Sequence, residues 1–489
     1  MKKLYVLLMG LLVLFTGSCV KESANAYIPD LPPATVSGYE KAYTVYTHQD
    51  QLNITPGVSD ERSYDYSWTV YSNNFNVNSG IVPKGDVIST SKDLHYEVLL
   101  NPGSYTLVFN IKNRITGVTQ LITSTLSVST LTMTGWYILK DDGNKTDFDF
   151  IYPTGRIDNW IANFNDGKGL TGKSIKAVYA GSFKNNLKST DLYSVLVAIT
   201  DQDAAIYRID NGKKVMGFDD MFFTRPDVKK PQNVLQPMSD NNVFLINDNK
   251  LFTLTKGTLF ASPPLSTYKI TPIAAIAARG IFFDDNSKSI VFSDNGTFAL
   301  PGANGALVKN MNADMVWVGG YAGLRSAALA LFKKPTGEGL LIKMNASYGP
   351  LSGSGDMVLG TKVVPATHGL MSADAIGGNY DSDYIYYAKG NNVYMTDFTS
   401  IPENLQVTLP QGEVVTCIQH IKYPQPAAGI ATTVDFLAIA SYQNGKYKVW
   451  LHKISSTGTI QQLSKPDFEG QGKVSCLNYV EKGIGSRVF

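Results

Sequence analysis

The residue whose surroundings point most clearly to a chemical reaction is Cys19. Two lysines precede an apolar run over residues 4–15, and Thr16-Gly17-Ser18 leads directly into this cysteine. The run is too short for a permanent membrane span and the chain after it is polar, which is typical of a cleaved export signal. Small residues ending at a cysteine form a lipobox, the bacterial signal for diacylation of the thiol and cleavage before it. We therefore expect residues 1–18 to be removed. Because each buried CH₂ of an acyl chain contributes about 0.8 kcal/mol to membrane binding, we expect the acylated Cys19 to anchor the mature protein.

Two readings of these features stay open. The export segment also fits an ordinary secretory signal followed by a chance cysteine. The other two cysteines, Cys417 and Cys476, both lie in apolar stretches. In an oxidising compartment they can form one disulfide, and the alternative is a pair of buried thiols on core strands.

Nothing else in the sequence has the spacing of a catalytic or metal-binding motif. The histidines show neither HExxH nor HxH, and no metal-ligand spacing with cysteine. A Gly-x-Ser-x-Gly elbow and a phosphate loop are absent as well. The closely spaced acids in Asp201-Gln202-Asp203 and Asp381-Ser382-Asp383 read as turns. The sequence therefore predicts no catalytic residue, no metal and no cofactor, although an acid pair for glycoside hydrolysis forms only on folding.

Aromatic residues near glycine-rich or polar connections are the remaining candidates for ligand contact. Flat side chains exposed on loops can stack on sugar rings or pack against peptides. The alternative for each of them is a packing role. The candidate ligand-binding residues are Trp160, Trp317, Tyr321 and Tyr380.

Composition predicts an all-β exported protein. The 43 basic residues less the two lysines of the signal leave 41, equal to the 41 acidic residues. A neutral chain has no overall field that would attract nucleic acid. The 27 tyrosines and 22 phenylalanines, together with 43 glycines, suit many short strands joined by tight turns. Long apolar runs at helical period are absent after the signal.

The N-terminal third is predicted to contain a tether and a small β-sandwich. Residues 19–33 are polar and proline-dotted, as expected for a lipidated tether. Strands with period-two alternation follow in residues 34–131, and Trp68 lies on one of them. About a hundred residues with a tryptophan on a central strand describe an Ig-like sandwich in which Trp68 is a core residue.

Residues 132–489 contain a diverged repeat of paired strands around tight polar turns. Aligning the second strands gives repeat intervals of 44 to 57 residues, which match the four-stranded blades of a β-propeller, here with seven blades. Gly319-Gly320, Gly323 and Gly377-Gly378 are expected on inner strands that crowd the channel. The segment 473–480 is expected to pair with an early strand and fasten the ring. The predicted hairpins are 136–139 with 148–152, 193–200 with 205–209, 243–246 with 251–254, 289–292 with 297–300, 327–333 with 340–344, 384–388 with 392–396, and 436–442 with 447–451.

These pieces together resemble the PKD-like family of lipoproteins of Bacteroidota, over roughly the first third of the chain. None of the motifs is catalytic, and their order carries the resemblance. Besides the export signal with Cys19, they are Tyr66-Ser67-Trp68-Thr69-Val70, Leu100-Asn101-Pro102-Gly103-Ser104-Tyr105-Thr106-Leu107, Asn113-Arg114-Ile115-Thr116-Gly117 and Gly135-Trp136-Tyr137-Ile138-Leu139.

The resemblance implies a location and partners. It suggests an outer-membrane surface lipoprotein, facing the cell exterior, that is a non-enzymatic accessory of a nutrient-uptake complex. Its partners would be a TonB-dependent transporter and a SusD-like lipoprotein, and its ligand a glycan or peptide. One alternative is a propeller-type extracellular glycosidase, lyase or peptidase acting on the same nutrient. Another is a purely structural docking surface for the transporter.

Overall fold

The computed structural model describes most of the chain and shows an all-β protein. The described residues are 33–73, 84–184, 192–235, 243–254, 259–261, 268–276, 280–294, 297–299, 303–321, 327–345, 356–423 and 434–481. The predicted export signal and Cys19 lie outside them. The chain divides into two compact units, the first ending at Ser129 and the second beginning at Thr130. The two units are described separately.

The described residues of the first unit form three small sheets. Its largest sheet has five strands and is antiparallel except for one parallel pair, β2 with β9. In sheet order these strands are β2 (Ala42–Tyr46), β9 (Thr119–Ser129), β8 (Gly103–Asn113), β5 (Tyr64–Ser72) and β6 (Asp86–Ser89). The two smaller sheets pair β3 (Gln51–Ile54) with β7 (Leu94–Glu97), and β1 (Val36–Ser37) with β4 (Gly57–Val58). A 3₁₀ turn, η1 (Glu61–Ser63), precedes β5.

Trp68 lies in the core of this unit, as the sequence predicts. Its side chain is fully buried, and its ring stacks on Phe109 with centroids 4.4 Å apart. The indole Nε1–H donates to the carbonyl oxygens of Ser91 and Lys92, so the buried polar atom is satisfied. Leu52 of β3 belongs to the same apolar cluster. The β3–β7 pair and the five-stranded sheet therefore face each other across one core, which is a β-sandwich.

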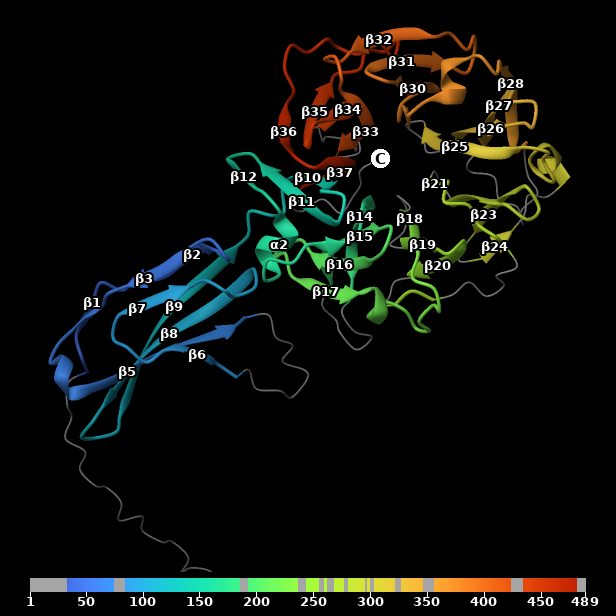
Figure 1. Ribbon diagram of the computed structural model, residues 1–489. Helices are drawn as coiled ribbons and strands as arrows, with labels where there is room; N and C mark the ends of the chain where they lie inside the picture. Colours follow the sequence, from blue (N-terminus) through green and yellow to red (C-terminus); the bar gives the residue numbers. More distant parts are fainter. Residues whose placement is uncertain are drawn as a thin grey trace, which may run out of the picture. The chain divides into compact units, whose positions relative to one another are not determined.

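The second unit consists of a series of sheets whose strands follow one another along the chain. Its described residues form seven sheets, arranged around a common centre in Figure 1. In sheet order, their strands are β37 (Lys473–Val480), β10 (Gly135–Asp141), β11 (Lys145–Tyr152) and β12 (Gly155–Ile157), with β13 (Leu170–Thr171) beside β11; β14 (Ser174–Phe183), β15 (Tyr193–Thr200), β16 (Ala204–Arg208) and β17 (Lys214–Gly217); β18 (Pro231–Leu235), β19 (Val243–Asn247) and β20 (Lys250–Leu254); β21 (Ala275–Ile276), β22 (Gly280–Asp284), β23 (Ser289–Asp294) and β24 (Thr297–Ala299); β25 (Asp314–Tyr321), β26 (Ala327–Lys333), β27 (Gly339–Asn345) and β28 (Val358–Val364); β29 (Ala375–Gly378), β30 (Tyr384–Lys389), β31 (Asn392–Asp397) and β32 (Asn404–Thr408); and β33 (Val414–Tyr423), β34 (Val434–Gln443), β35 (Lys446–His452) and β36 (Phe468–Gln471).

Helical structure in the described part of this unit is limited to short connections. They are α2 (Trp160–Phe164) and the 3₁₀ segments η3 (Phe218–Asp220), η4 (Ala303–Val308) and η5 (Gly369–Ser372). Within the part of the chain that the structure describes, no helix has the length and hydrophobicity of a membrane span.

All seven predicted hairpins are present as antiparallel pairs. Tight turns set their registers. Between β19 and β20, Asp248 and Asn249 both have positive φ, and between β34 and β35, Asn444 and Gly445 do as well. Two successive residues with positive φ are what a two-residue hairpin turn of type I′ requires. Asparagine, aspartate and glycine tolerate that conformation best, which explains why the turn signals were readable in the sequence.

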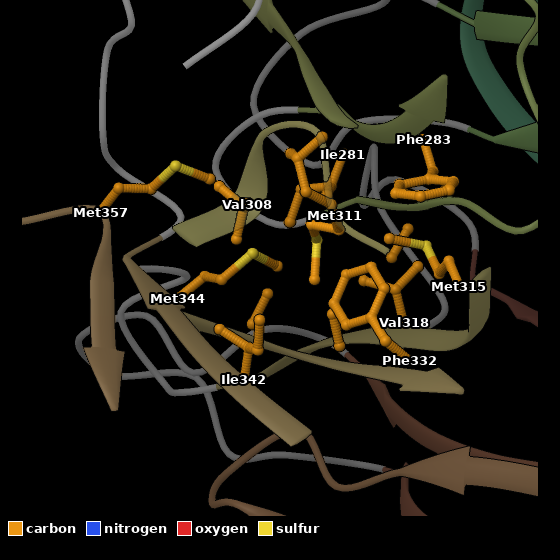
Figure 2. Packing of buried hydrophobic residues seen from close by; sticks show 14 of the residues in the cluster. Ile281, Phe283, Val308, Met311, Met315, Val318, Phe332, Ile342, Met344 and Met357 are labelled. Atoms are coloured by element: carbon orange, nitrogen blue, oxygen red, sulfur yellow. The ribbon is translucent and has the colours of Figure 1, made fainter. Parts of the chain in front are cut away.

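The sheets of this unit are buried on both faces. On β22, Ile281 and Phe283 point into the cluster drawn in Figure 2, where Phe332 of β26 packs against Phe283 with ring centroids 5.7 Å apart. Phe282 lies between them in sequence and belongs to a different cluster with Phe244 of β19. Successive side chains of a strand point to opposite faces, so each sheet fills the gap to the neighbour on either side. This arrangement is propeller-like.

The unit closes through β37, as the sequence analysis expects for residues 473–480. This strand pairs antiparallel with β10, from Gly135 opposite Val480 to Asp141 opposite Lys473. The pairing shifts register between Leu139 and Lys140. The strand that comes last in the chain thus joins the first sheet, and two strands that would otherwise be sheet edges satisfy each other.

The closure predicts a large stability cost for a small change in β37. Leu477 is fully buried, so Leu477→Ala should lower the free energy of unfolding by about 2–5 kcal/mol, through lost burial and a residual cavity. Urea unfolding followed by tryptophan fluorescence measures the change. Leu405→Ala is the matched control, because Leu405 lies 56% exposed on β32, and its effect should stay within about 0.5 kcal/mol. Equal midpoint shifts for the two variants would contradict the closing role of β37.

Candidate functional site

The second unit encloses a central cavity lined by the first strands of several sheets. Its volume is about 430 Å³, and β14, β25, β29, β33 and β37 contribute most of the wall. These strands are neighbours around the centre: β14 and β33 both adjoin β37, and β29 adjoins both β25 and β33. The wall carries aromatic, amide, thiol and charged side chains in place of a uniformly apolar lining. We refer to it below as the central cavity.

Glycines make room for the aromatic part of this wall. Trp317 on β25 lines the cavity, and a β-carbon on Gly319 would lie 2.5 Å from Cζ2 of its indole. Residues two apart share one face of a strand, so only glycine at 319 leaves space for the ring. On β29, a β-carbon on Gly377 would come within 2.5 Å of the backbone oxygen of Ile418, and Gly378 also lines the cavity. The expectation of crowded glycines on inner strands is confirmed here, while Gly323 lies outside the described residues.

A hydrogen-bonded chain fixes the wall between β29 and β33. The backbone N–H of Tyr380 donates to Nδ1 of His420 over 2.7 Å. In the neutral imidazole the proton is then on Nε2, which lies 2.9 Å from Oδ1 of Asp435. Lys422 forms ion pairs with Asp435 and with Asp381, at 2.9 and 2.7 Å. Both ring nitrogens of His420 are therefore engaged by the protein itself.

Contacts within this chain favour the charged form of Asp435. Partial burial opposes ionisation of Asp435, but hydrogen bonds from His420 and Lys422 outweigh it and hold its pKa below the ordinary value. Ligand atoms of Asp381, His420 and Asp435 all lie within 4.8 Å of one another, a spacing that a metal ion can use. The ammonium group of Lys422 already contacts both carboxylates, so the protein itself balances one of their two negative charges.

Cys417 of β33 and Cys476 of β37 both line the central cavity as free, buried thiols. The sequence left open a disulfide or a pair of buried thiols, and the structure has the pair of buried thiols. The Cys417 thiol donates to Oε1 of Gln419 over 3.2 Å, and the Cys476 thiol lies 3.6 Å from the carbonyl oxygen of Ala177. Burial raises the pKa of both thiols, that of Cys417 strongly, so neither is an activated nucleophile.

The predicted ligand-contact residues fall into different environments. Trp317 and Tyr380 line the same central cavity, although Tyr380 is only 4% exposed and neither lies on an exposed loop. The structure corrects the candidate role of Trp160 in ligand contact. This residue of α2 is fully buried and packs edge-on against Tyr137, so it belongs to the core. Tyr321 ends β25, and its side chain lies outside what the structure describes. The two acidic triplets lie in turns, as expected, with Asp381 and Asp203 in ion pairs.

Three polar residues of the cavity wall were missed by the sequence analysis. They are Lys176, Gln419 and His420. Each lies on the first strand of a sheet, whereas the readable repeat consisted of the later hairpin strands. A signal was present in the apolar stretch 175–179, in which Lys176 is the single charged residue.

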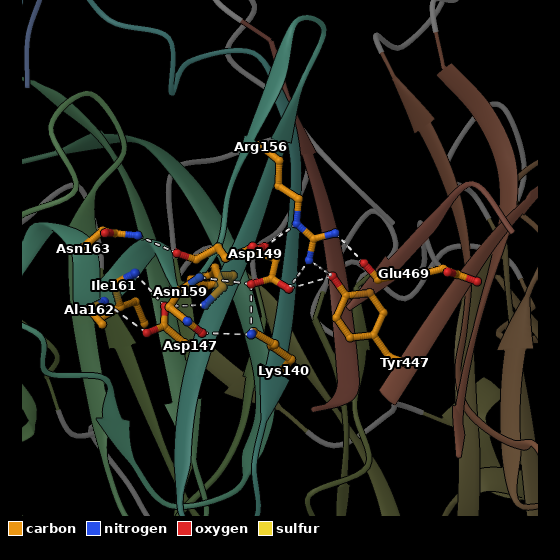
Figure 3. Close-up of polar contacts among 12 residues, drawn as sticks. Lys140, Asp147, Asp149, Arg156, Asn159, Ile161, Ala162, Asn163, Tyr447 and Glu469 are labelled. Carbon is orange, nitrogen blue, oxygen red and sulfur yellow. Dashed lines mark hydrogen bonds and ion pairs between the residues drawn. The ribbon is translucent and has the colours of Figure 1, made fainter. Parts of the chain in front are cut away.

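A second cavity, with a polar lining and a volume of about 670 Å³, lies between the sheet of β10 and the sheet of β33. Asp149 of β11 is its central anion and contacts Lys140 at 3.0 Å, Arg156 at 2.7 Å and the hydroxyl of Tyr447 at 2.7 Å. Tyr447 belongs to β35, and Arg156 also donates to the backbone oxygen of Glu469 (Figure 3). These bonds tie the ends of the unit together, and we call them the polar seam. Because the seam satisfies its own charges, we assign it to closure and not to ligand binding.

Asp147, beside the polar seam, is an unusually placed carboxylate. It is 8% exposed and accepts backbone hydrogen bonds from Phe148, Ile161 and Ala162, at 2.7, 2.6 and 3.0 Å. Burial raises the pKa of Asp147 to about 6, although these hydrogen bonds oppose the shift. The carboxyl group therefore changes its charge in the mildly acidic range.

Comparison with known protein families supports the first unit. Residues 19–177 match the PKD-like family, from the predicted lipidation site through the sandwich into β14. No protein of curated function matches the chain in sequence.

Among solved structures, the chain is similar to a quinonprotein alcohol dehydrogenase-like protein from Bacteroides thetaiotaomicron, at 13% identity and a TM-score of 0.43, covering 92% of this chain and 100% of that one. It is also similar to a DUF4784 family protein from Bacteroides caccae, at 12% identity and a TM-score of 0.27, covering 89% of this chain and 96% of that one. A third similar structure is the WD40 domain of SCAP from fission yeast, at 12% identity and a TM-score of 0.31, covering 63% of this chain and 74% of that one. These TM-scores lie below 0.5, so the propeller-like fold rests on the strand pairings of the chain itself.

The position of Asp147 predicts a pH-dependent contribution to stability. Its folded pKa of about 6 exceeds the unfolded value of 3.8, so the folded state binds more protons between these values and this contribution falls as pH rises from about 4 to 6. The unfolding free energy of the wild type minus that of Asp147→Asn should decrease by about 2 kcal/mol over this range. Urea midpoints at several pH values measure it, with exposed Asp166→Asn as control. A difference that is constant from pH 4 to 7 would refute the assignment.

Proposed function

We propose that this protein is a lipid-anchored outer-membrane surface protein that binds a nutrient in its central cavity, without catalysis, as an accessory of a TonB-dependent, SusCD-type uptake complex. The nutrient is a glycan or a peptide. Its sandwich serves as a PKD-like spacer, and its second unit is a seven-bladed β-propeller. The central cavity is the observation that carries this proposal.

The anchor is supported from the N-terminal side of the chain. Small residues lead into Cys19, and the match to the PKD-like family begins at the same residue. Acyl chains on that thiol would keep the folded units outside the cytoplasm, beside a membrane. The seven-bladed interpretation is supported by seven sheets in the described residues and by the pairing of β37 with β10.

The residues of the central cavity suit ligand binding better than catalysis. A volume of about 430 Å³ lies within the range of small-molecule sites, roughly 300–1,000 Å³. Trp317 offers an aromatic wall, whereas the imidazole of His420, the side chain of the lining best suited to proton transfer, is occupied. His420 uses both ring nitrogens, and Asp374, the carboxylate in the described lining, accepts a hydrogen bond from Gly390 over 2.7 Å. A propeller-type glycosidase, lyase or peptidase needs a free acid or base facing its substrate.

Loss of the aromatic wall should weaken ligand binding without unfolding the protein. Detergent-solubilised full-length protein is titrated calorimetrically with a panel of oligosaccharides and short peptides. Trp317→Ala should weaken the binding of the panel member that binds best by at least about tenfold, since stacking contributes on the order of 1.4 kcal/mol. Phe223→Ala, at a 60% exposed aromatic residue outside the cavity, is the control and should bind like the wild type. Equal affinities for all three proteins would contradict binding in the cavity.

The proposed partners predict co-purification from the native membrane. Affinity capture of the tagged protein from solubilised outer membranes should also bring down a TonB-dependent transporter and a SusD-like lipoprotein. Cys19→Ala should lose both the acyl chains and the capture, because the tether places the protein beside the transporter. Recovery of the wild-type chain alone at native expression would contradict the accessory role. Unchanged membrane binding of Cys19→Ala would contradict the anchor.

A further inference from the structure

The central cavity contains a positive charge without an acidic partner. Lys176 of β14 lines the wall, and its ammonium group makes no ion pair or hydrogen bond with any other described residue. The neighbouring strands β33 and β37 offer it the thiols Cys417 and Cys476 in place of carboxylates. Burial lowers the pKa of Lys176, and the two thiols oppose the shift only in part. An unpaired, largely buried ammonium group is costly, and a protein that retains one has a use for its charge.

Two neutral hydrogen-bond donors lie in the same wall. The hydroxyl of Ser475 on β37 is buried and has no partner among the described residues. Gln419 of β33 uses its Oε1 to accept from the backbone N–H of Leu477 and from Cys417. Its NH₂ group also lies beside the Cys476 thiol, and having two hydrogens it keeps a second N–H to donate. One cation and two donors therefore face the cavity from three neighbouring strands. Of the other lining side chains that can carry charge near neutral pH, His420 is hydrogen-bonded to Asp435, and Asp374 is exposed and accepts from the backbone N–H of Gly390.

We propose that the central cavity binds a ligand that carries a carboxylate, with Lys176 as its counter-ion and Ser475 and Gln419 as hydrogen-bond donors. This inference rests on the proposed function and specifies the class of nutrient. A carboxylate carries one negative charge, which the one ammonium group balances. A phosphate ester carries nearly two and would leave a charge uncompensated in the described lining.

The wall opposite Lys176 completes the ligand description. Trp317 on β25 belongs to a sheet three positions around the centre from that of β14. A ligand that spans the cavity thus meets a charge on one side and an aromatic face on the other. A uronic acid has a carboxylate and a flat sugar face, and a short peptide has a terminal carboxylate and side chains. The shared chemistry is the carboxylate, and the experiment separates the two sources.

The test compares each acid with its neutral form, using the full-length protein in detergent. The probes are D-galacturonate against D-galactose, and N-acetyl-alanyl-alanine against N-acetyl-alanyl-alanine amide, titrated by calorimetry. The acid of at least one pair should bind at least tenfold more tightly than its neutral partner. Lys176→Met should abolish that ratio, whereas Lys176→Arg, which keeps the charge, should retain it. Lys446→Met, at an exposed lysine on β35, is the matched control and should behave like the wild type.

The outcomes separate this inference from the function on which it rests. Equal affinity for acid and neutral probes, or an unchanged ratio in Lys176→Met, would overturn the role of Lys176. If a neutral probe binds and Trp317→Ala abolishes that binding, ligand capture stands and only the carboxylate preference is wrong. Failure of all four probes and of the wider panel would contradict capture itself. Without ligand, Lys176→Met should melt no lower than the wild type, because it removes an unpaired buried charge.

Discussion

The pairing of β37 with β10 is the constraint on which the second unit depends. Each sheet of this unit is buried against a neighbour on both faces, so a series of sheets with two free ends would leave apolar faces and strand edges exposed. The antiparallel pairing of β37 with β10 removes that problem at the seam. Hydrogen bonds from Arg156 and Tyr447 to Asp149 reinforce the same junction with charge. Local hairpins build the unit, and one long-range pairing makes it closed.

Closure also explains why polar side chains can persist at the centre. First strands of neighbouring sheets converge there, and glycines such as Gly377 allow their backbones to approach closely. Side chains on these strands either link neighbouring strands or face the central cavity. The side-chain oxygen of Gln419 links β33 to β37, whereas the ammonium group of Lys176 faces the cavity. The scaffold satisfies most of its polar groups internally and leaves a small set facing the cavity.

The sequence predicted the parts of this structure that local patterns determine. Alternating strands around turns such as Asn444-Gly445 identified one hairpin in each of the seven sheets, because turn chemistry and period-two burial act over a few residues. The polar part of the site was not predictable in this way. His420 and Asp435 lie on different strands, and Lys176 meets its thiol neighbours only when distant strands converge. Trp160 was a candidate because polar residues flank it, but they stand at the ends of a short helix whose tryptophan faces the core.

The position of β37 has a consequence for when the central cavity exists at all. This strand is synthesised after every other described strand, yet Ser475 and Cys476 on it form part of the cavity wall. A chain that has not yet placed β37 therefore has no finished pocket, however well its earlier sheets have folded. Under the proposed function, ligand binding would then be confined to completely synthesised molecules, and a product truncated before β37 would not compete for ligand.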